Sequence, residues 1–393
     1  MENKTTYQSE LFSNRLKKKY KELRKWARKN RIMCYRLYNR DIPEIPVSLD
    51  LYEFLPEAVD TPIEAARFLQ AQNTRLSEND PTVEKEIKER TYAVLYLYER
   101  PYEKSDEEEE LWLEEMSKAA AGVLQIEKNH IIKKYRKHQT HKEGNQYQKN
   151  DSREEIYDDE KITGLTAECG SLFRLDLSSY LDTGLFFDHR PLREVVRDTC
   201  SNKDVLNLFC YTGSFSVYAA GGNAKSVESV DLSNTYLDWA KDNMNLNGFD
   251  DKKRYTFTRE DCVKFLKEKA LAQKSLSGTE KDNHKNTGEL KPKTYDLIIL
   301  DPPTFSNSKK TFDVFDVNRD WSQLVKDCLN ILNPGGVLYF STNSEKLKFD
   351  SSLIPPKTLF GKSYTAEEIT PQTIPEDYEG KKPHRVWKFS VEK

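Results

Sequence analysis

The sequence predicts an α/β fold with a mainly parallel β-sheet, preceded by a small α+β domain and a basic N-terminal helix. Three observations predict this arrangement. Short apolar runs alternate with helical stretches after about residue 162, and the part before it mixes strand and helix patterns. Residues 1–40 carry 13 Lys and Arg against three Glu. Because alternating strands and helices indicate βαβ units, the predicted domains are 1–40, 41–162 and 163–393.

The composition excludes several classes of protein. The 393 residues include 62 Lys and Arg against 65 Asp and Glu, so the net charge of −3 does not by itself indicate nucleic-acid binding. No apolar run approaches the roughly 20 residues of a membrane helix, and the N-terminus lacks a secretory signal. The six cysteines have no metal-ligand spacing. We therefore expect a cytoplasmic protein with reduced thiols, no metal and no membrane partner.

The N-terminal segment is predicted to be a helix with one apolar and one basic face. Leu16, Tyr20, Leu23 and Ala27 recur at helical spacing, and Ser13 is the predicted N-cap. The opposite face is either an ordinary solvated surface or a phosphate-binding face. A second basic segment covers residues 130–149. The predicted phosphate-binding residues of the two segments are Arg15, Lys18, Lys21, Arg24, Lys25, Arg28, Lys134, Arg136 and Lys149.

The middle of the chain has the pattern of a small mixed domain. Residues 47–54 and 91–98 are rich in β-branched and aromatic side chains and predict strands. Residues 104–124 predict a helix that begins in the acidic run 106–110, which suits the helix dipole and needs no functional explanation.

The second half predicts buried parallel strands at 205–209, 226–230, 255–258, 297–300 and 337–340, with a helix at 235–246. Residues 267–293 are polar, with few large apolar side chains, and predict a surface insertion without chemistry of its own.

The first of these strands runs into a turn that suits a nucleoside ligand. In LNLFCYTGSFS (206–216), Gly213 precedes a helix whose first N–H groups can face a ligand. Asp231 stands 18 residues later, at the end of the next strand, where nucleoside-binding sheets hold ribose hydroxyls. By itself this pattern also fits an ordinary βα turn. The single glycine counts against a nicotinamide cofactor, whose binding turn has G-x-G-x-x-G.

Two further strand ends are acidic. Asp261 follows the third strand and is placed to meet an adenine amino group, and the fourth strand ends in LIILDPPTFSNS (297–308). Pro302 and Pro303 fix an extended turn after Asp301. Together these acids and the glycine turn are typical of an S-adenosylmethionine (SAM) methyltransferase. Phe305 is a candidate for stacking on a target base or, equally, a core aromatic.

Several distinctive strings then identify a family. They include EGNQYQK (143–149), LSSYLDTGLFFDHRPLR (177–193), LNLFCYTGS (206–214) and DPPTFSNSK (301–309). The chain resembles the guanine-N7 methyltransferase half (K-type) of the bifunctional 23S ribosomal RNA guanine methyltransferase K/L family. The resemblance implies a class I (Rossmann-like) methyltransferase fold, SAM as methyl donor, and a guanine of 23S ribosomal RNA or a large-subunit precursor as substrate.

The better-known members of the family also carry a second, N-terminal methyltransferase with an RNA-binding module, which this chain begins without. We therefore expect guidance to the RNA from the basic N-terminal region or from a separate RNA-targeting methyltransferase partner.

The resemblance also implies site residues. Asp188 and Arg190 would face the methionine end of SAM, and Asp301 would lie nearest the transferring methyl group. The predicted catalytic residues are Asp301 and, as the candidate for stacking on the target base, Phe305. The implied cofactor-binding residues are Asp188, Arg190, Asn207, Phe209, Tyr211, Thr212, Gly213, Ser214, Asp231, Leu232, Asp261, Cys262, Asp301 and Pro302.

The chemistry of the target atom fits this set. Guanine N7 carries a lone pair and no proton, so attack on SAM needs alignment but no general base. Methylation of cytosine C5 needs a cysteine nucleophile, and residues 340–343 after the fifth strand read Phe-Ser-Thr-Asn. Alternatives remain: an RNA methyltransferase acting on cytosine C5 or a guanine exocyclic amine, or a non-catalytic ribosome-assembly protein.

Overall fold

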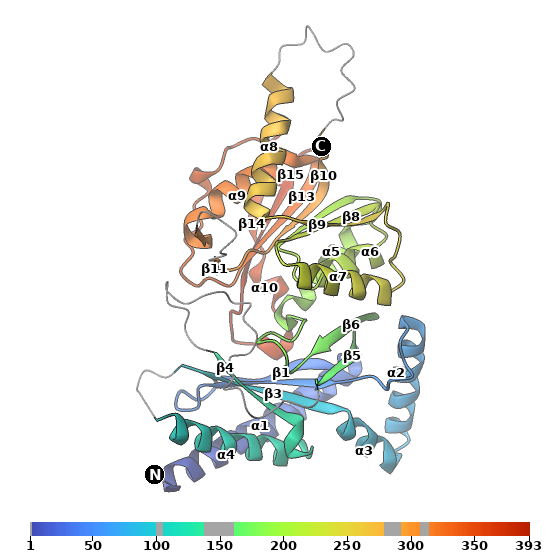
Figure 1. The fold of residues 1–393 in the computed structure, drawn as a ribbon, viewed down its shortest axis with the longest axis vertical. Helices are drawn as coiled ribbons and strands as arrows, with labels where there is room; N and C mark the ends of the chain where they lie inside the picture. Colours follow the sequence, from blue (N-terminus) through green and yellow to red (C-terminus); the bar gives the residue numbers. More distant parts are fainter. Residues whose placement is uncertain (1, 100–104, 137–160, 279–291, 307–313) are drawn as a thin grey trace. The chain divides into compact units, whose positions relative to one another are not determined.

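The computed structural model describes residues 2–99, 105–136, 161–278, 292–306 and 314–393. Two compact units make up the chain (Figure 1). The first comprises Met1–Phe187 with Glu376–Glu379, and the second comprises Asp188–Pro375 with Gly380–Lys393. In the described parts of the chain, no helix combines the length and apolar character needed to cross a bilayer.

The first unit is a four-stranded sheet with helices and a separate hairpin. Its elements are α1 (Glu2–Asn30), β1 (Cys34–Asn39), β2 (Val47–Glu53), α2 (Pro62–Ser77), α3 (Pro81–Glu89), β3 (Thr91–Tyr98), α4 (Asp106–Leu124), η1 (Lys128–His130), β4 (Ile131–Arg136), β5 (Thr163–Glu168), β6 (Ser171–Asp176) and η4 (Glu376–Tyr378). The sheet order is β1-β2-β3-β4, antiparallel except for the parallel β3–β4 pair. The strands predicted at 47–54 and 91–98 and the helix predicted at 104–124 are confirmed.

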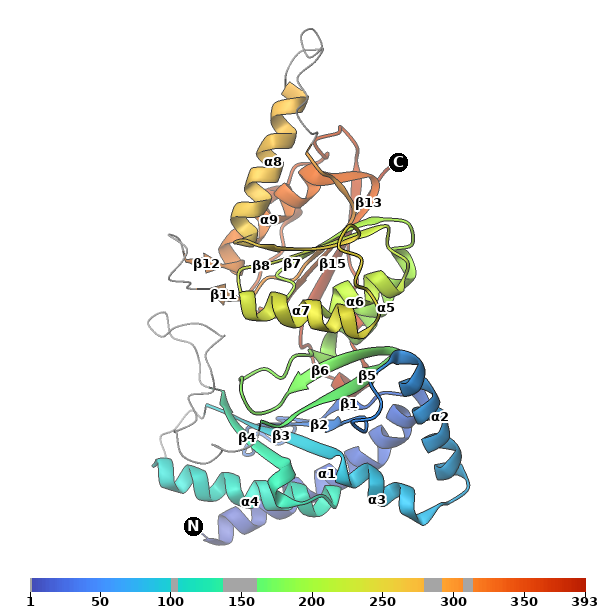
Figure 2. The same ribbon diagram turned by 45° about the vertical axis from the view of Figure 1, so that its right-hand side comes forward.

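The helices α1 and α4 lie side by side against one face of this sheet (Figures 1 and 2). The predicted apolar stripe of α1 is confirmed, since Leu16, Leu23 and Ala27 are buried. The predicted N-cap at Ser13 is wrong. The helix begins at Glu2 because Phe12, one turn before Leu16, continues the buried stripe toward the N-terminus.

The two units divide the chain differently from the predicted boundaries at 40/41 and 162/163. Helix α1 shares a core with the first sheet, so residues 1–40 are not a separate segment. The β5–β6 hairpin also belongs to this unit, because the Leu55 N–H donates to the Leu165 carbonyl (2.7 Å). The short η4 joins the same unit, where Asp377 accepts from the Arg36 N–H (3.0 Å).

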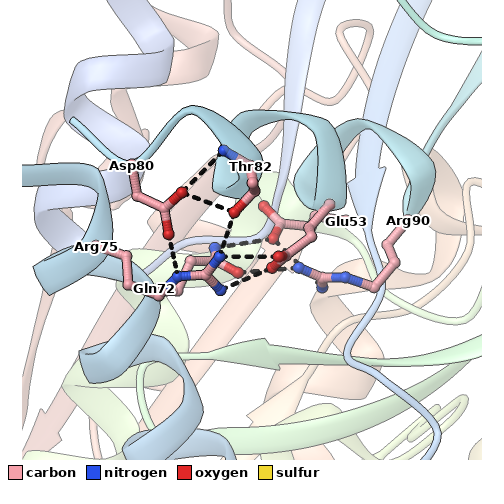
Figure 3. Close-up of polar contacts among 7 residues, drawn as sticks. Glu53, Gln72, Arg75, Asp80, Thr82 and Arg90 are labelled. Atoms are coloured by element: carbon pink, nitrogen blue, oxygen red, sulfur yellow. Dashed lines mark hydrogen bonds and ion pairs between the residues drawn. The ribbon is translucent and has the colours of Figure 1, made fainter.

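The α2–α3 hairpin is stabilised by a polar network that Figure 3 shows. The Arg75 guanidinium donates to Asp80 (2.7 Å) and to both oxygens of Glu86 (2.8 Å each). Glu53 of β2 and Arg90 lie close together beside it (3.6 Å). Each of these charged groups has a partner within the hairpin or the adjoining strand, so this network is structural.

The second unit is a seven-stranded sheet covered by helices on both faces. Its elements are α5 (Arg190–Thr199), β7 (Asp204–Leu208), α6 (Ser214–Gly221), β8 (Ser226–Asp231), α7 (Asn234–Leu246), β9 (Tyr255–Arg259), α8 (Cys262–Gly278), β10 (Tyr295–Leu300), β11 (Phe305–Ser306), β12 (Phe315–Asp316), α9 (Val317–Ile331), β13 (Leu332–Thr342), η3 (Ser351–Leu353), β14 (Tyr364–Glu368), α10 (Thr370–Thr373) and β15 (Arg385–Val391). The one-turn η2 (Phe187–His189) spans the boundary between the units.

The strand order is β14-β15-β13-β10-β7-β8-β9. The five strands from β13 to β9 are parallel, and β15 is antiparallel to both of its neighbours. All five predicted parallel strands and the helix predicted at 235–246 are confirmed. The chain turns back between β7 and β10, the switch point at which such sheets bind ligands outside the carboxyl ends of their strands.

The helices α8 and α9 pack on one face of this sheet and α5, α6 and α7 on the other (Figure 2). Leu206, Ile298 and Phe340 from the middle strands share a core with Phe265 and Trp321 from α8 and α9. Of the surface insertion predicted at 267–293, residues up to Gly278 continue α8. Residues 279–291 of that insertion lie outside the described residues.

Candidate active site

The turn between β7 and α6 has an unusual backbone that its neighbours hold in place. Phe209 and Tyr211 have φ values of +54° and +50°, although they are not glycines. The Phe209 N–H donates to the Cys262 sulfur (3.2 Å), and the Asn243 side chain donates to the Thr212 carbonyl (2.9 Å). Such left-handed residues persist only where the surrounding structure determines them, and they cluster at ligand sites.

Gly213 is required at the start of α6 for two reasons. Its φ is +74°, a conformation that L side chains rarely adopt, and a Cβ atom there would lie 2.8 Å from the Cβ of Ala240. Helix α6 therefore packs closely on α7, and Ser214 is its first residue. The free N–H groups of this first turn lie at the carboxyl edge of the sheet.

Asp231 at the end of β8 is tied to the same turn. Its Oδ2 accepts from the Tyr211 N–H (3.1 Å) and its Oδ1 from the Ser233 N–H (2.9 Å). Burial raises the pKa of this carboxyl to about 6, and the backbone hydrogen bonds only partly oppose the shift. The structure thus brings Asp231 and the Phe209–Ser214 turn together, as predicted.

Of the other predicted cofactor residues near this turn, two lie at the carboxyl edge of the sheet and two are buried in the core of the second unit. Asp261 Oδ1 accepts from the Lys264 N–H (2.9 Å) in the first turn of α8, while Leu232 is half-buried at the end of β8. The thiol of Cys262 is buried and points to the Val230 carbonyl (3.4 Å). The side chain of Asn207 is also buried, and its NH₂ group donates to the Ser216 hydroxyl (2.9 Å). Both Cys262 and Asn207 therefore can contribute only backbone atoms to a ligand.

Asp301 lies at the carboxyl end of β10, beside the switch point. Its side chain is 28% exposed, and Oδ1 lies 3.6 Å from Nε2 of His189. Pro302 is buried, and Phe305 is half-buried in β11, which pairs with β12. The carboxylate of Asp301 therefore faces solvent at the edge of the sheet with one buried imidazole beside it.

The structure places two histidines in the site that the sequence did not predict. The rings of His189 and His384 stack with centroids 4.4 Å apart. His384 Nδ1 donates to Asp188 Oδ2 (2.9 Å), and His189 Nδ1 lies 3.5 Å from the same oxygen. His189 was visible beside Asp188 in the sequence, but His384 stands 196 residues further along the chain, so no local pattern connects it to this site.

The groups of this network shift one another's pKa values. Burial disfavours the charge on Asp188, but His189 and His384 outweigh it and hold the pKa of Asp188 well below its ordinary value. Burial also opposes a charge on His189, but Asp301 and Asp188 raise its pKa. Burial and the neighbouring His189 lower the pKa of His384. The neighbouring charges therefore favour protonation of His189, which lies between two carboxylates, and disfavour protonation of His384.

Asp188, His189 and His384 offer ligand atoms within 4.8 Å of one another, a spacing that a metal ion could use. Their nitrogens, however, already have protein partners. His189 Nε2 is hydrogen-bonded to Ser341 Oγ (2.8 Å), and the Thr373 hydroxyl lies 3.0 Å from His384 Nε2. A hydrogen-bond network therefore accounts for the cluster.

Arg190 and the α1 residues complete the predicted set. Arg190 is buried at the first position of α5. Lys18, Lys21 and Lys25 are exposed on α1. Three arginines of the same helix make ion pairs instead, Arg15 with Asp41 (2.8 Å) and both Arg24 (3.5 Å) and Arg28 (2.9 Å) with Glu84.

In the described part of the second basic segment, residues 130–136, two of the predicted RNA contacts have partners within the protein. Lys134 is fully buried, and its ammonium group donates to the carbonyls of Tyr180 (2.5 Å) and Leu181 (3.2 Å). Burial lowers its pKa to about 8. Arg136 pairs with Asp182 (2.7 Å). These two side chains hold the loop after β6, so Lys134 is withdrawn as an RNA contact. Lys149 lies outside the described residues.

The sheet order, the glycine turn and the acids at the ends of β8, β9 and β10 define a class I SAM-dependent methyltransferase. A protein-family model described as an S-adenosylmethionine-dependent methyltransferase matches residues 137–355. The chain belongs to the ribosomal RNA large subunit methyltransferase K/L family, and SAM is its cofactor.

Two relatives support this family. A protein from Neisseria meningitidis, named "Ribosomal RNA large subunit methyltransferase K", is 37% identical over 96% of this chain and 86% of its own length. A protein from Magnetococcus marinus, named "Ribosomal RNA large subunit methyltransferase K/L", is 35% identical over 97% of this chain. The chain spans 43% of the Magnetococcus protein, less than half of its length.

Solved structures confirm the fold. A protein described as a SAM-dependent methyltransferase from Streptococcus mutans has a TM-score of 0.60 at 20% identity and covers 98% of this chain and 81% of its own. A methyltransferase structure complexed with S-adenosylhomocysteine (SAH), named SMU.776, gives 0.61 at 21% identity over 98% of this chain and 82% of its own.

Proposed function

We propose that this protein transfers a methyl group from SAM to N7 of a guanine in 23S ribosomal RNA or its large-subunit precursor. The observation that carries the proposal is the 37% identity, over 96% of the chain, to a relative named "Ribosomal RNA large subunit methyltransferase K". That relative is covered over 86% of its length, so the similarity extends well beyond the methyltransferase fold.

The residues at the sheet edge suit the cofactor. Each oxygen of Asp231 accepts from one backbone N–H and can also accept from a ribose hydroxyl. Gly213 ends the same turn at the start of α6, and a Cβ there would collide with Ala240 of α7. Asp188 and Arg190 are proposed to face the methionine end, and Asp261 the adenine. When bound, SAM would supply an electrophilic methyl group for transfer, with Asp301 proposed as the residue nearest to it.

The proposed acceptor needs little from the protein beyond alignment. The N7 lone pair would form the new bond to the methyl carbon. The bond from that carbon to sulfur would break, and its two electrons would stay on the sulfur of SAH. No proton moves, so no general base is required, and the work of the protein is orientation. The carboxylate of Asp301 favours the positive charge that the guanine acquires.

The cysteines argue against cytosine C5 as the target. That reaction needs an accessible thiolate. All four cysteines of the second unit, Cys200, Cys210, Cys262 and Cys328, are 5% exposed or less, and burial raises the pKa of each thiol. A buried, protonated thiol cannot add to a pyrimidine ring.

The direct test uses labelled SAM, unmodified 23S transcript, nuclease digestion and mass spectrometry of the nucleosides. We expect N7-methylguanosine from the wild type, loss of the label with Asp301→Ala, and full activity with Asp238→Ala, an exposed carboxylate on α7. Label in 5-methylcytidine or N2-methylguanosine would contradict the proposal. Bound SAH without any label on naked RNA or on ribosomal precursors would favour a non-catalytic assembly protein.

The exposed lysines of α1 are proposed to bind the RNA backbone. We expect Lys18→Glu/Lys21→Glu/Lys25→Glu to weaken binding of the transcript at least tenfold and to reduce its salt dependence by roughly two to three counterions. The matched control is Lys252→Glu/Lys253→Glu/Lys267→Glu, which reverses three exposed charges on the second unit. Equal losses in both variants would contradict a dedicated surface on α1. Guidance by a separate methyltransferase partner then remains the alternative.

A further inference from the structure

Thr304 and Asn343 meet at the edge of the sheet beside Asp301, although neither is among the predicted site residues. Strands β10 and β13 are parallel neighbours, with Leu300 opposite Phe340. Both chains therefore leave the sheet at the same edge. There the Thr304 hydroxyl donates to the side-chain oxygen of Asn343. Asn343 is exposed, in a stretch whose neighbours are buried.

The backbone on each side of this pair is fixed. The Val317 N–H at the start of α9 donates to the Thr304 carbonyl (3.0 Å). The Ser344 N–H donates to the hydroxyl of the buried Thr342 (3.1 Å), and the Ser344 hydroxyl donates to Asn318 (2.7 Å). The Asn343 amide is thus displayed from a rigid frame, which is what precise recognition of a ligand requires.

The Thr304 contact decides which atoms of the amide remain available. An asparagine side chain has an accepting oxygen and a donating NH₂ group. With the oxygen accepting from Thr304, the NH₂ group is left to meet a ligand. Asn343 therefore presents an NH₂ donor to solvent, held by Thr304, which lies three residues after Asp301 in the chain.

The edge of guanine that carries N7 offers only acceptors, N7 and O6, whereas adenine offers N7 beside an N6 donor. A donor fixed next to the reacting nitrogen accepts guanine and rejects adenine. We propose that Asn343, oriented by Thr304, determines base specificity by donating from its NH₂ group to guanine O6. This inference rests on the proposed function and identifies guanine O6 as the atom that Asn343 recognises.

The experiment compares the target guanosine with 2-aminopurine riboside, which keeps N7 and lacks O6, at the nucleotide mapped by mass spectrometry. For wild type we expect kcat/KM for N7 methylation to fall about 10–100-fold on this replacement. Asn343→Ala should lose a similar factor with guanosine and show little further loss with 2-aminopurine. Thr304→Val should lose part of the discrimination, because its side chain no longer orients the amide.

Two controls separate recognition from folding. Asn245→Ala, which removes an exposed amide on α7, should behave as wild type on both substrates, and SAH affinity should be unchanged in every variant. Equal discrimination by wild type and Asn343→Ala overturns the inference and leaves the proposed function intact. Wild type that forms no N7-methylguanosine overturns both.

Discussion

At the scale of single residues, Asp231 shows how burial changes the acidity of a proposed cofactor contact. Its carboxyl has a pKa of about 6, because it lies below the surface with only backbone N–H groups as partners. Ribose hydroxyls need the ionised form as acceptor. At about pH 5 only about one tenth of such a group is ionised. We therefore expect the Kd of SAH, measured by calorimetry, to rise about tenfold between about pH 7.5 and about pH 5.

The variant Asp231→Asn provides the control for this pH effect. It should bind SAH roughly 10–100-fold more weakly at neutral pH, as for the loss of a charged acceptor, and its affinity should depend little on pH in this range. A wild-type Kd that is the same at both pH values would contradict the assignment of Asp231 to the ribose.

His189 gives a second pH dependence, of opposite sign. Its pKa in the folded protein lies above the ordinary 6.5, because Asp301 and Asp188 outweigh the effect of burial. A histidine with a raised pKa stabilises the fold fully below about pH 6.5, and this contribution disappears as the pH rises through the folded pKa. We expect the Tm of the second unit to fall over that range in the wild type.

The comparison for His189 is the same pH series of thermal unfolding with His189→Gln and with His130→Gln in the first unit. With His189→Gln the decrease in Tm with rising pH should become smaller, and with His130→Gln it should be the same as in the wild type. A fall that persists in His189→Gln would show that the stacked pair does not carry the charge.

At the scale of elements, two glycines allow the cost of backbone strain to be measured apart from the cost of a packing clash. The first is Gly213, in the turn before α6. Gly213→Ala introduces both a left-handed alanine and a methyl group 2.8 Å from Ala240. We expect a loss of about 2–4 kcal/mol in the free energy of unfolding and at least a tenfold weaker Kd for SAH. Chemical denaturation and calorimetry measure the two.

Gly248 provides the matched position. It has φ +78°, and nothing lies within 4 Å of its Cβ position. Gly248→Ala should therefore cost only about 1 kcal/mol and leave SAH binding unchanged. Equal effects at the two glycines would mean that the contact with Ala240 is unimportant.

Among the basic elements, sequence reasoning worked for α1 and failed for β4. The spacing of apolar residues in α1 identified the buried face and left Lys18, Lys21 and Lys25 exposed, as observed. In β4 the alternation of side chains was not clear from the sequence, and Lys134 proved to be buried on the carbonyls of a loop more than 40 residues later. Charge alone does not say whether a lysine faces water, because backbone carbonyls can satisfy an ammonium group.

At the scale of the whole molecule, the proposed cofactor site belongs to a single unit. Every residue assigned to it, from Asp188 to His384, lies in the second unit. A ligand that binds one folded unit stabilises that unit, by about 2.7 kcal/mol at 100 times its Kd. In scanning calorimetry we expect two transitions, of which saturating SAH raises only one, and Asp231→Asn should abolish the shift. A uniform shift of both transitions would show that the units unfold together.

The sequence by itself determined the five parallel strands of the second unit, the helix α7, the glycine turn and the acids at the strand ends. These features follow from local patterns, since apolar runs set the strands and parallel βαβ connections bring all carboxyl ends to one edge. Three contacts became clear only from the tertiary structure. They are the hydrogen bond between His384 and Asp188, the burial of Lys134, and the hydrogen bond from Thr304 to Asn343. These contacts join residues 39 to 196 positions apart, and packing, rather than any local periodicity, decides which of them meet.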